Sequence, residues 1–293
     1  MKSEETGARS RWDDPFYNQT PLTRFAATVA RLAGVEAPAC AAEPIEWVCD
    51  QLTAICRDRI DRVFIHNPDA VGMWLYQKYP DAFEVVLKHV QVTLPMRTAM
   101  PSITPVCFAT MYTGAEPEVH GILERKKPME PVQVDTLFEA MIRAGKKVAL
   151  VSVSTASMSQ LFLGKGMDIY NCEDEPAVVA KAQELILQDE YDMICVYTYM
   201  YDNMDHIYGP EGKEALEALY NQGKHFDKMV TLIKQQWKDH NTLISFSTDH
   251  GVHAFENPHE LYKGKWLKVG GHGTDSPLDI NVLHGIGVIC ASK

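Results

Sequence analysis

The chain contains 293 residues, of which 46% are hydrophobic and 23% are charged. These proportions describe a globular protein with a substantial apolar core and exclude collagen-like, coiled-coil and disordered classes. The 28 basic and 39 acidic residues leave a formal charge of -11, which argues against a nucleic-acid-binding surface. An anionic substrate would therefore need local positive charge, and a bound metal ion is a ready source of it.

Neither a membrane-spanning nor a secretory segment is predicted. The first apolar stretch, 25–35, is too short to cross a bilayer and contains Arg31. The seven cysteines are scattered and odd in number, which is typical of reduced buried thiols rather than of a disulfide framework. We therefore expect a cytoplasmic protein with no membrane partner.

The chain begins with helical patterns and continues as strands that alternate with helices. Apolar residues recur at helical spacing over 22–32 and 45–55, so residues 1–60 are predicted to be a helical extension. A strand at 63–65 follows and is closed by Asn67-Pro68-Asp69, because the proline cannot continue a ladder. The later elements are predicted as helix 136–144, strand 147–153, helix 176–187, strand 193–196, helix 213–237 and strand 243–246.

This alternation predicts an α/β fold with a mostly parallel sheet that helices cover on both faces. We find no internal repeat and no long linker, so a single domain over 1–293 is expected. Ligands of such sheets bind at the C-terminal ends of the strands. The residues that follow the predicted strands are therefore the first candidates for a functional site.

Acidic and imidazole side chains follow two of these strands, and a further histidine lies among glycines near the C-terminus. They are Asp202 and His206 after strand 193–196, Asp249 and His250 after strand 243–246, and His272. Carboxylates and imidazoles together are the ligands that zinc and similar divalent ions prefer. Each motif alone also fits solvated loop residues, because short motifs recur by chance.

A threonine hydroxyl completes the set of candidates. Pro105 suits the first position of a helix, which makes Thr104 the predicted N-cap. The N-terminus of a helix accepts phosphate readily, because its backbone N–H groups are unpaired and the helix dipole is positive there. Taken alone, capping is the simpler role for Thr104.

In their order along the chain, these segments resemble the alkaline phosphatase superfamily, and most closely its type I phosphodiesterase/nucleotide pyrophosphatase and phosphonoacetate hydrolase branch. The resemblance runs from about Val63 to the end. It rests on Pro-Ser-Ile-Thr-Pro at 101–105, Thr-Gly-Ala-Glu-Pro-Glu-Val-His-Gly-Ile at 113–122, Asp202 with His206 and Tyr-Gly-Pro at 208–210, Thr-Asp-His-Gly at 248–251 and Gly-His-Gly at 271–273. It implies a three-layer α/β/α fold with a minimal cap, since only a short segment separates His250 from His272.

The resemblance also implies two divalent metal ions. One would be held by Asp202, His206 and His272, and the other by Asp249, His250 and an aspartate that follows the first strand. Asp69 is the predicted residue and Asn67 its rival, because the family usually has Asp-Gly directly after that strand. Zinc is favoured by these ligands, and manganese or iron also suits them.

The same resemblance makes Thr104 the nucleophile and a ligand of the second ion. A hydroxyl is a poor nucleophile at neutral pH, and coordination to a dication lowers its pKa. We therefore predict attack by Thr104 on phosphorus, a phosphothreonine intermediate, and hydrolysis of that intermediate by water at the Asp202 site. Cys107 stands where phosphodiesterase relatives often have an asparagine that holds a phosphoryl oxygen, so it is the predicted substrate-binding residue, with a buried core thiol as the alternative.

Other polar residues receive structural roles. His120 is predicted to be a structural loop histidine and Asp205 an exposed carboxylate, whereas no partner is predicted for His253, His259 and His284.

The sequence therefore predicts a metal-dependent hydrolase that cleaves a small phosphate ester, phosphodiester or phosphonate. A phosphomutase of the same superfamily and a non-catalytic metal- or phosphate-binding relative are the alternatives. The oligomeric state is left open.

Overall fold

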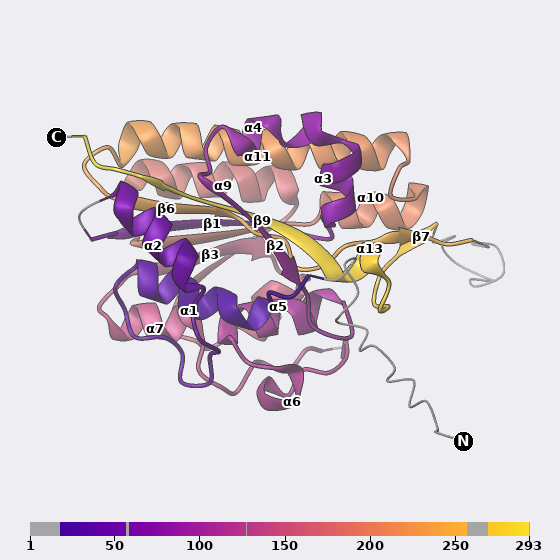
Figure 1. The fold of residues 1–293 in the computed structure, drawn as a ribbon, viewed down its shortest axis with the longest axis horizontal. Coiled ribbons are helices and arrows are strands. Elements are labelled where there is room, and N and C mark those ends of the chain that lie inside the picture. The colour runs from indigo at the N-terminus through magenta and orange to yellow at the C-terminus, as the bar shows by residue number, and fades with distance from the viewer. Residues whose placement is uncertain (1–17, 57–58, 127, 257–268, 293) are drawn as a thin grey trace, which may run out of the picture.

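The computed structural model describes residues 18–56, 59–126, 128–256 and 269–292. A twisted central sheet lies between two layers of helices (Figure 1). Its strands are β1 (Arg62–Pro68), β2 (Val92–Arg97), β3 (Val148–Val153), β4 (Asp168–Cys172), β5 (Met193–Thr198), β6 (Thr242–Phe246) and β9 (Asn281–Ile289). In the described residues these seven strands follow the order β2-β9-β6-β1-β5-β3-β4.

Most of the sheet is parallel, as predicted. Strands β6, β1, β5, β3 and β4 run in the same direction, and β9 runs antiparallel to both β6 and β2. The central strand is β1, whose Phe64 pairs with Ile194 on one side and Ile244 on the other. Because helices cover both faces, the buried part of this strand begins with the continuous apolar run Val-Phe-Ile at 63–65.

The helices form the two outer layers (Figure 1). One layer contains α3 (Met73–Lys78), α4 (Glu84–Leu87), α9 (Glu175–Gln188), α10 (Met200–Tyr208) and α11 (Lys213–Gln236). The other contains α1 (Phe25–Leu32), α2 (Glu46–Ile55), α5 (Thr104–Thr113), α6 (Pro117–His120) and α7 (Leu137–Arg143). The shorter elements are the 3₁₀ turns η2 (Leu22–Arg24) and η3 (Pro80–Phe83), helices α8 (Ser157–Leu161) and α13 (Pro277–Ile280), and strands β7 (His253–Ala254) and β8 (Gly270–Gly271).

The three-layer α/β/α prediction is confirmed, and three of the seven strands of this sheet were not predicted. Strand β2 mostly alternates buried and exposed residues and contains a proline, whereas β4 has no buried residue. Both lie at the edges of the sheet, where one side of the strand has no neighbour. Strand β9 is buried but contains two glycines, at 285 and 287, which weaken a strand pattern.

The N-terminal helices pack on the layer that contains α5. Phe25 of α1 contacts the ring of Tyr112 of α5 edge to face, with ring centroids 6.3 Å apart. It also contacts His284 of β9, with centroids 5.3 Å apart. The part of the chain that the family resemblance did not cover therefore contributes to the core beneath α5.

Cys56 and Cys290 form a disulfide between the end of α2 and the residue that follows β9, with Cα atoms 5.5 Å apart. The prediction of reduced thiols is wrong for this pair, because the two partners are 234 residues apart in sequence. The other five cysteines, all within the described residues, are free. Disulfides are rare in the reducing cytoplasm, so the cytoplasmic prediction loses part of its basis.

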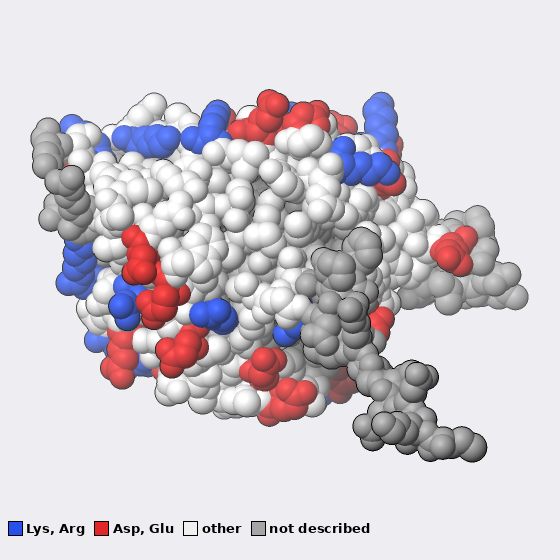
Figure 2. All heavy atoms as spheres, in the orientation of Figure 1, with Lys and Arg blue, Asp and Glu red and all other residues white. Residues whose placement is uncertain are grey.

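Charged side chains on the face in view gather at its edges. Figure 2 shows acidic and basic side chains around the rim of this face, whereas the centre of the face is mostly uncharged. Within the described part of the chain, no helix combines the length and the hydropathy that crossing a bilayer requires.

We expect that replacing both Cys56 and Cys290 by serine lowers the free energy of unfolding by about 2–4 kcal/mol, because the bond closes a long loop in the unfolded chain. Urea unfolding measures the loss, and Cys40→Ser, which removes an exposed free thiol, is the control. Thiol titration of the denatured, unreduced protein should find five thiols, and a value of seven would contradict the disulfide.

His284 makes folding sensitive to acid. Its buried Nε2 donates to the Thr248 carbonyl at 2.7 Å, and burial lowers the pKa of this imidazole from 6.5 to about 4. Between these values the unfolded chain binds a proton that the folded protein does not, so stability falls as the pH falls, by about 1.4 kcal/mol per pH unit. Urea unfolding of the metal-free protein at several pH values should show a shallower dependence for His284→Gln, and equal slopes would contradict this assignment.

Candidate metal centre

Three neighbouring parallel strands end at the same edge of the sheet, and five of the predicted site residues follow them in sequence. Asp69 directly follows β1, Asp249 and His250 come shortly after β6, and α10, which begins two residues after β5, carries Asp202 and His206. Parallel strands that lie side by side place their C-terminal ends together, which is where ligands of such sheets bind. The strand order β6-β1-β5 thus brings together segments that are far apart in sequence.

The first cluster consists of Asp202, His206 and His272. Asp202 and His206 are four residues apart on α10 and therefore share one face of the helix. His272 follows β8, and its Nε2 lies 3.4 Å from Asp202 Oδ1, while His206 Nε2 lies 3.5 Å from the same atom. One ligand atom from each residue lies within 4.8 Å of the others, so the three could hold a metal ion.

The second cluster consists of Asp69, Asp249 and His250, all buried. His250 Nε2 lies 3.4 Å from Asp69 Oδ1 and 3.3 Å from Asp249 Oδ2. The two clusters are adjacent, because the ring of His250 stacks on that of His272 with centroids 4.0 Å apart.

Asn67, the rival of Asp69, belongs to the core. Its amide donates to the Ser247 carbonyl at 2.7 Å, and its carbonyl oxygen accepts the Tyr112 hydroxyl at 2.5 Å. The structure therefore brings Asp69, and not Asn67, to the second cluster.

The three histidines share one orientation. In each, Nδ1 lies next to a backbone carbonyl, which can only accept: Gly270 O at 3.0 Å for His206, Gly251 O at 3.0 Å for His250 and Ser102 O at 3.1 Å for His272. Nδ1 therefore carries a proton, and in the neutral imidazole Nε2 presents a lone pair to the carboxylates. A lone pair that faces a carboxylate is unfavourable, and either a second proton on the imidazole or a cation between the two groups removes the repulsion.

The carboxylates fit the same requirement. Within the described residues, three buried oxygens of the clusters have no hydrogen-bond donor, namely Asp69 Oδ1, Asp202 Oδ1 and Asp249 Oδ2. Burying such groups without partners is costly, and metal coordination is a common compensation. The donor set of three carboxylates and three imidazoles thus fits divalent cations.

The electrostatics of the metal-free site point the same way. Burial raises the pKa of Asp69 well above its usual value, and the charges of Asp249 and Asp202 raise it further. Burial also raises the pKa of Asp249, to about 7. For Asp202, burial alone would raise the pKa, but the neighbouring imidazole of His272 outweighs it and holds the pKa below the usual range. Without added positive charge, the three carboxyl groups therefore do not all ionise readily.

Thr104 is the first residue of α5 rather than its N-cap, which is Ile103. The prediction was wrong by one position because the threonine hydroxyl does not cap the helix. Its Oγ1 lies 3.3 Å from His250 Nε2 and 3.5 Å from Asp69 Oδ2, so it is directed into the second cluster.

Tyr197 was not predicted as a site residue. Its hydroxyl donates a short hydrogen bond to Asp69 Oδ2, and its side chain is buried near the end of β5. The available signal was its position, because a buried tyrosine near the end of a parallel strand needs a partner for its hydroxyl.

A cavity of about 330 Å³ opens beside the first cluster. Its wall includes Asp202 and Tyr197 together with Arg125, Tyr199 and Asn203. Of the six cluster residues, Asp202 is the one that lines this cavity, so a ligand there would lie next to the first cluster.

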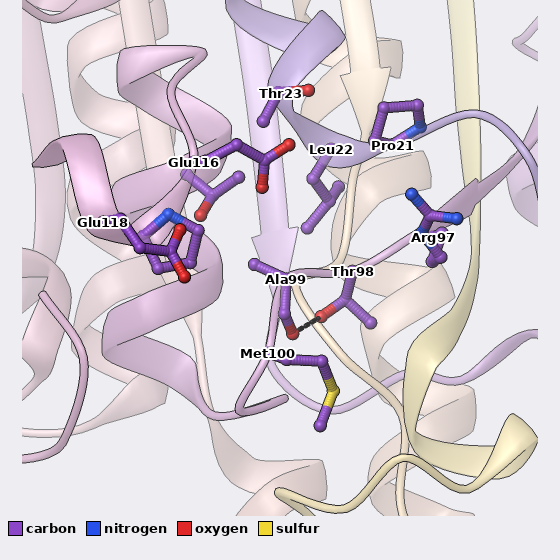
Figure 3. Close-up of a pocket in the computed structure, with 11 residues that line it drawn as sticks. Pro21, Leu22, Thr23, Arg97, Thr98, Ala99, Met100, Glu116 and Glu118 are labelled. Atoms are coloured by element: carbon purple, nitrogen blue, oxygen red, sulfur yellow. Dashed lines mark hydrogen bonds between the residues drawn. The ribbon is translucent and has the colours of Figure 1, made fainter. Parts of the chain in front are cut away.

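Cys107 belongs to neither cluster. Its Sγ is fully buried and lies 2.9 Å from Thr98 Oγ1. Thr98 lines a separate cavity of about 150 Å³, which Figure 3 shows beside Arg97, Glu116 and the N-terminal turn at Pro21. None of the cluster residues lines that cavity. The contacts of Cys107 are those of a packed core thiol.

The remaining predicted residues have structural partners. His120 Nε2 lies 2.9 Å from Thr110 Oγ1, His253 Nδ1 lies 2.8 Å from Asp279 Oδ1, and His284 bonds the Thr248 carbonyl. Asp205 is buried rather than exposed, 3.6 Å from His206 Nδ1. His259 lies outside the described residues, as does most of the segment predicted to form the minimal cap, whose base is the pairing of β7 with β8.

The type I phosphodiesterase/nucleotide pyrophosphatase family matches the chain over residues 84–132 and 171–282, together more than half of it. These ranges contain Thr104 and every cluster residue except Asp69. No curated protein matches the chain by sequence.

Solved structures are similar in fold. Human ectonucleotide pyrophosphatase/phosphodiesterase 5 has a TM-score of 0.60 and 14% identity, covering 77% of this chain and 87% of that chain. The murine protein has a TM-score of 0.52 and 17% identity, covering 67% and 59%. Its inactive threonine-to-alanine variant in complex with AMP has a TM-score of 0.52 and 16% identity, covering 68% and 59%.

Divalent ions should stabilise the folded protein, because they would place positive charge among buried carboxylates. At about 100 times its dissociation constant, an ion adds about 2.7 kcal/mol per site. Asp249→Asn removes one buried charge and keeps an acceptor for the Ala70 N–H, which lies 3.1 Å from Oδ1. We expect the metal-free variant to melt no lower than the original protein and to gain less stability from zinc or manganese.

Scanning calorimetry of chelator-treated protein, with and without added metal, measures both quantities. Asp50→Asn, which changes an exposed carboxylate on α2, is the control. Equal metal-induced shifts in the original protein and in Asp249→Asn would argue against a cation at the second cluster.

Proposed function

Because this chain belongs to the type I phosphodiesterase/nucleotide pyrophosphatase family, and is therefore a phosphoric ester hydrolase, we propose that it cleaves a small phosphate ester, phosphodiester or phosphonate with Thr104 as nucleophile and two divalent metal ions. One observation carries the proposal: three histidine Nε2 atoms converge on three buried carboxylates beside the Thr104 hydroxyl.

In this proposal Asp202, His206 and His272 hold one ion, and Asp69, Asp249 and His250 hold the other. Zinc is the proposed metal, because mixed carboxylate and imidazole ligands are typical of catalytic zinc, and manganese or iron would suit the same groups. When bound, the two ions lower the pKa of the Thr104 hydroxyl and stabilise the charge on the transferred phosphoryl group.

The chain's own groups then perform a double displacement. Thr104 loses its proton towards the carboxylate of Asp69, 3.5 Å away, and its oxygen attacks phosphorus. The bond from phosphorus to the leaving group breaks in line, the leaving group takes up a proton, and a phosphothreonine remains. Water then attacks phosphorus, which releases the phosphoryl product and restores the Thr104 hydroxyl.

Tyr197 assists in this scheme by holding Asp69. Its hydroxyl donates to Asp69 Oδ2, the oxygen next to Thr104, and this contact orients the carboxylate. Both side chains are buried, so water does not compete for the hydrogen bond that orients the carboxylate.

The cavity of about 330 Å³ beside Asp202 is the proposed binding place of the leaving group. Arg125 adds positive charge to its wall, and the ring of Tyr199 stacks on that of Tyr197 with centroids 6.4 Å apart. The murine relative was solved with AMP, which supports nucleotide esters as the first substrates to test.

We expect Thr104→Ala to lower turnover by about 1,000-fold or more, because no other group occupies the nucleophile's place. Hydrolysis of nitrophenyl phosphate, bis-nitrophenyl phosphate and a nitrophenyl nucleotide ester measures turnover, and elemental analysis should find unchanged metal content. Thr113→Ala is the matched control on the same helix, since that hydroxyl bonds only within the neighbouring backbone, to Ala109 O and Ala115 N.

Full activity of Thr104→Ala would contradict the mechanism. Metal binding without hydrolysis of any of the three substrates would instead favour a phosphomutase or a non-catalytic relative. Acid-quenched protein should carry a phosphoryl group on the peptide that contains Thr104.

A further inference from the structure

A buried carboxylate accepts hydrogen bonds at the start of the helix that carries Asp202 and His206. Glu175, the first residue of α9, is 3% exposed, and its Oε2 accepts the backbone N–H groups of Tyr199 and Met200, both at 2.7 Å. Met200 is the first residue of α10. The first turn of a helix has N–H groups without partners inside the helix, and an anion is favourable there. Glu175 therefore satisfies two donors at the start of α10.

The second oxygen of Glu175 ends a chain of buried hydrogen bonds. Its Oε1 accepts the Gln222 amide at 2.9 Å, and Gln222 Oε1 accepts the Thr198 hydroxyl at 2.5 Å. The Thr198 hydroxyl is 2.8 Å from His66 Nε2, which must be the donor because the threonine proton is already used. Every donor in the chain points towards Glu175, so the chain joins β1, β5 and α11 to the N-terminus of α9.

This network lies behind the helix that carries two residues of the first cluster. Asp202 and His206 both lie on α10, whereas His272 follows β8. A shift of α10 therefore changes the distance from Asp202 to His272, which is now 3.4 Å. The residues of the second cluster follow β1 and β6, and none of them lies on α10.

We propose that Glu175 is a positioning residue: together with Gln222 it holds the start of α10 so that Asp202 and His206 meet His272 around one of the two metal ions. This inference rests on the proposed function, because it assumes a metal ion at the first cluster. It specifically predicts that loss of Glu175 lowers the affinity for the ion at the first cluster and leaves the affinity for the other ion unchanged.

The hydrogen-bond chain itself supplies a matched pair of variants. In Glu175→Gln the new amide oxygen still accepts the two backbone N–H groups, but without a charge. The new amide nitrogen faces the Gln222 amide nitrogen, so these two groups pair only if the Gln222 amide flips and reverses the hydrogen bonds to Thr198 and His66. Adding Gln222→Glu restores the pairing, since the carboxylate at 222 accepts from both the amide at 175 and the Thr198 hydroxyl. The double variant keeps the hydrogen bonds from Thr198 to position 222 and from there to position 175, and it moves the charge from position 175 to position 222.

Metal binding by the intact protein at 25 °C, well below unfolding, tests the inference by chelator competition with zinc and by counting bound ions. We expect two ions in the original protein. In Glu175→Gln one ion should keep its affinity and the other should bind about 10- to 100-fold more weakly, as for other changes to groups that orient metal ligands. The double variant should recover to within about threefold, and kcat should follow occupancy of the weakened site.

Glu139→Gln is the structural control. Glu139 also accepts a backbone N–H at a helix start, that of Thr136 at 3.0 Å, but on α7 in the opposite layer. It should melt at a lower temperature and bind both ions with the original affinities.

Unchanged affinity for both ions in Glu175→Gln, equal weakening of both, or no recovery in the double variant would each overturn the positioning role. Two ions in the original protein would still support the proposed function in those cases. An original protein that binds no ion would overturn both.

Discussion

The arrangement of this site depends on three carboxylates buried together at the C-terminal ends of three parallel strands. Burial and mutual repulsion raise the pKa of Asp69 and Asp249, and backbone carbonyls at Nδ1 direct the Nε2 atoms of the neighbouring imidazoles at the carboxylates. A bound cation would offset the negative charge of the carboxylates and would also accept the Nε2 lone pairs of neutral imidazoles. The negative overall charge of the chain and an anionic substrate are compatible for the same reason, since positive charge would be concentrated where the substrate reacts.

Groups behind the clusters keep the ligands in place. Backbone carbonyls of Ser102, Gly251 and Gly270 fix the three imidazole rings, and Tyr197 fixes Asp69. Glu175, which Gln222 contacts, binds the backbone at the start of α10 and so acts on a whole helix rather than on one side chain. A buried polar network of this kind is rigid because each of its members would lose a hydrogen bond by moving.

The scaffold around Thr104 extends beyond the matched family ranges. Tyr112 of α5 bonds Asn67 at the end of β1, and Phe25 of α1 packs against the same tyrosine. Asn67 therefore ties the helix that starts with Thr104 to the strand that leads to Asp69. A polar residue two positions from Asp69 thus has a structural role.

Local patterns in the sequence were sufficient for much of the fold and for part of the site. The 3.6-residue period of α11 and the apolar run of β1 are encoded by neighbouring residues, and so is the shared face of Asp202 and His206. Tertiary structure alone decided that Asp69 rather than Asn67 joins the second cluster and that Cys107 is buried in the core. It also decided the Cys56–Cys290 bond and the contact of Glu175 with α10. Each of these depends on partners that are distant in sequence, up to 234 residues for the disulfide, and packing rather than local spacing selects such partners.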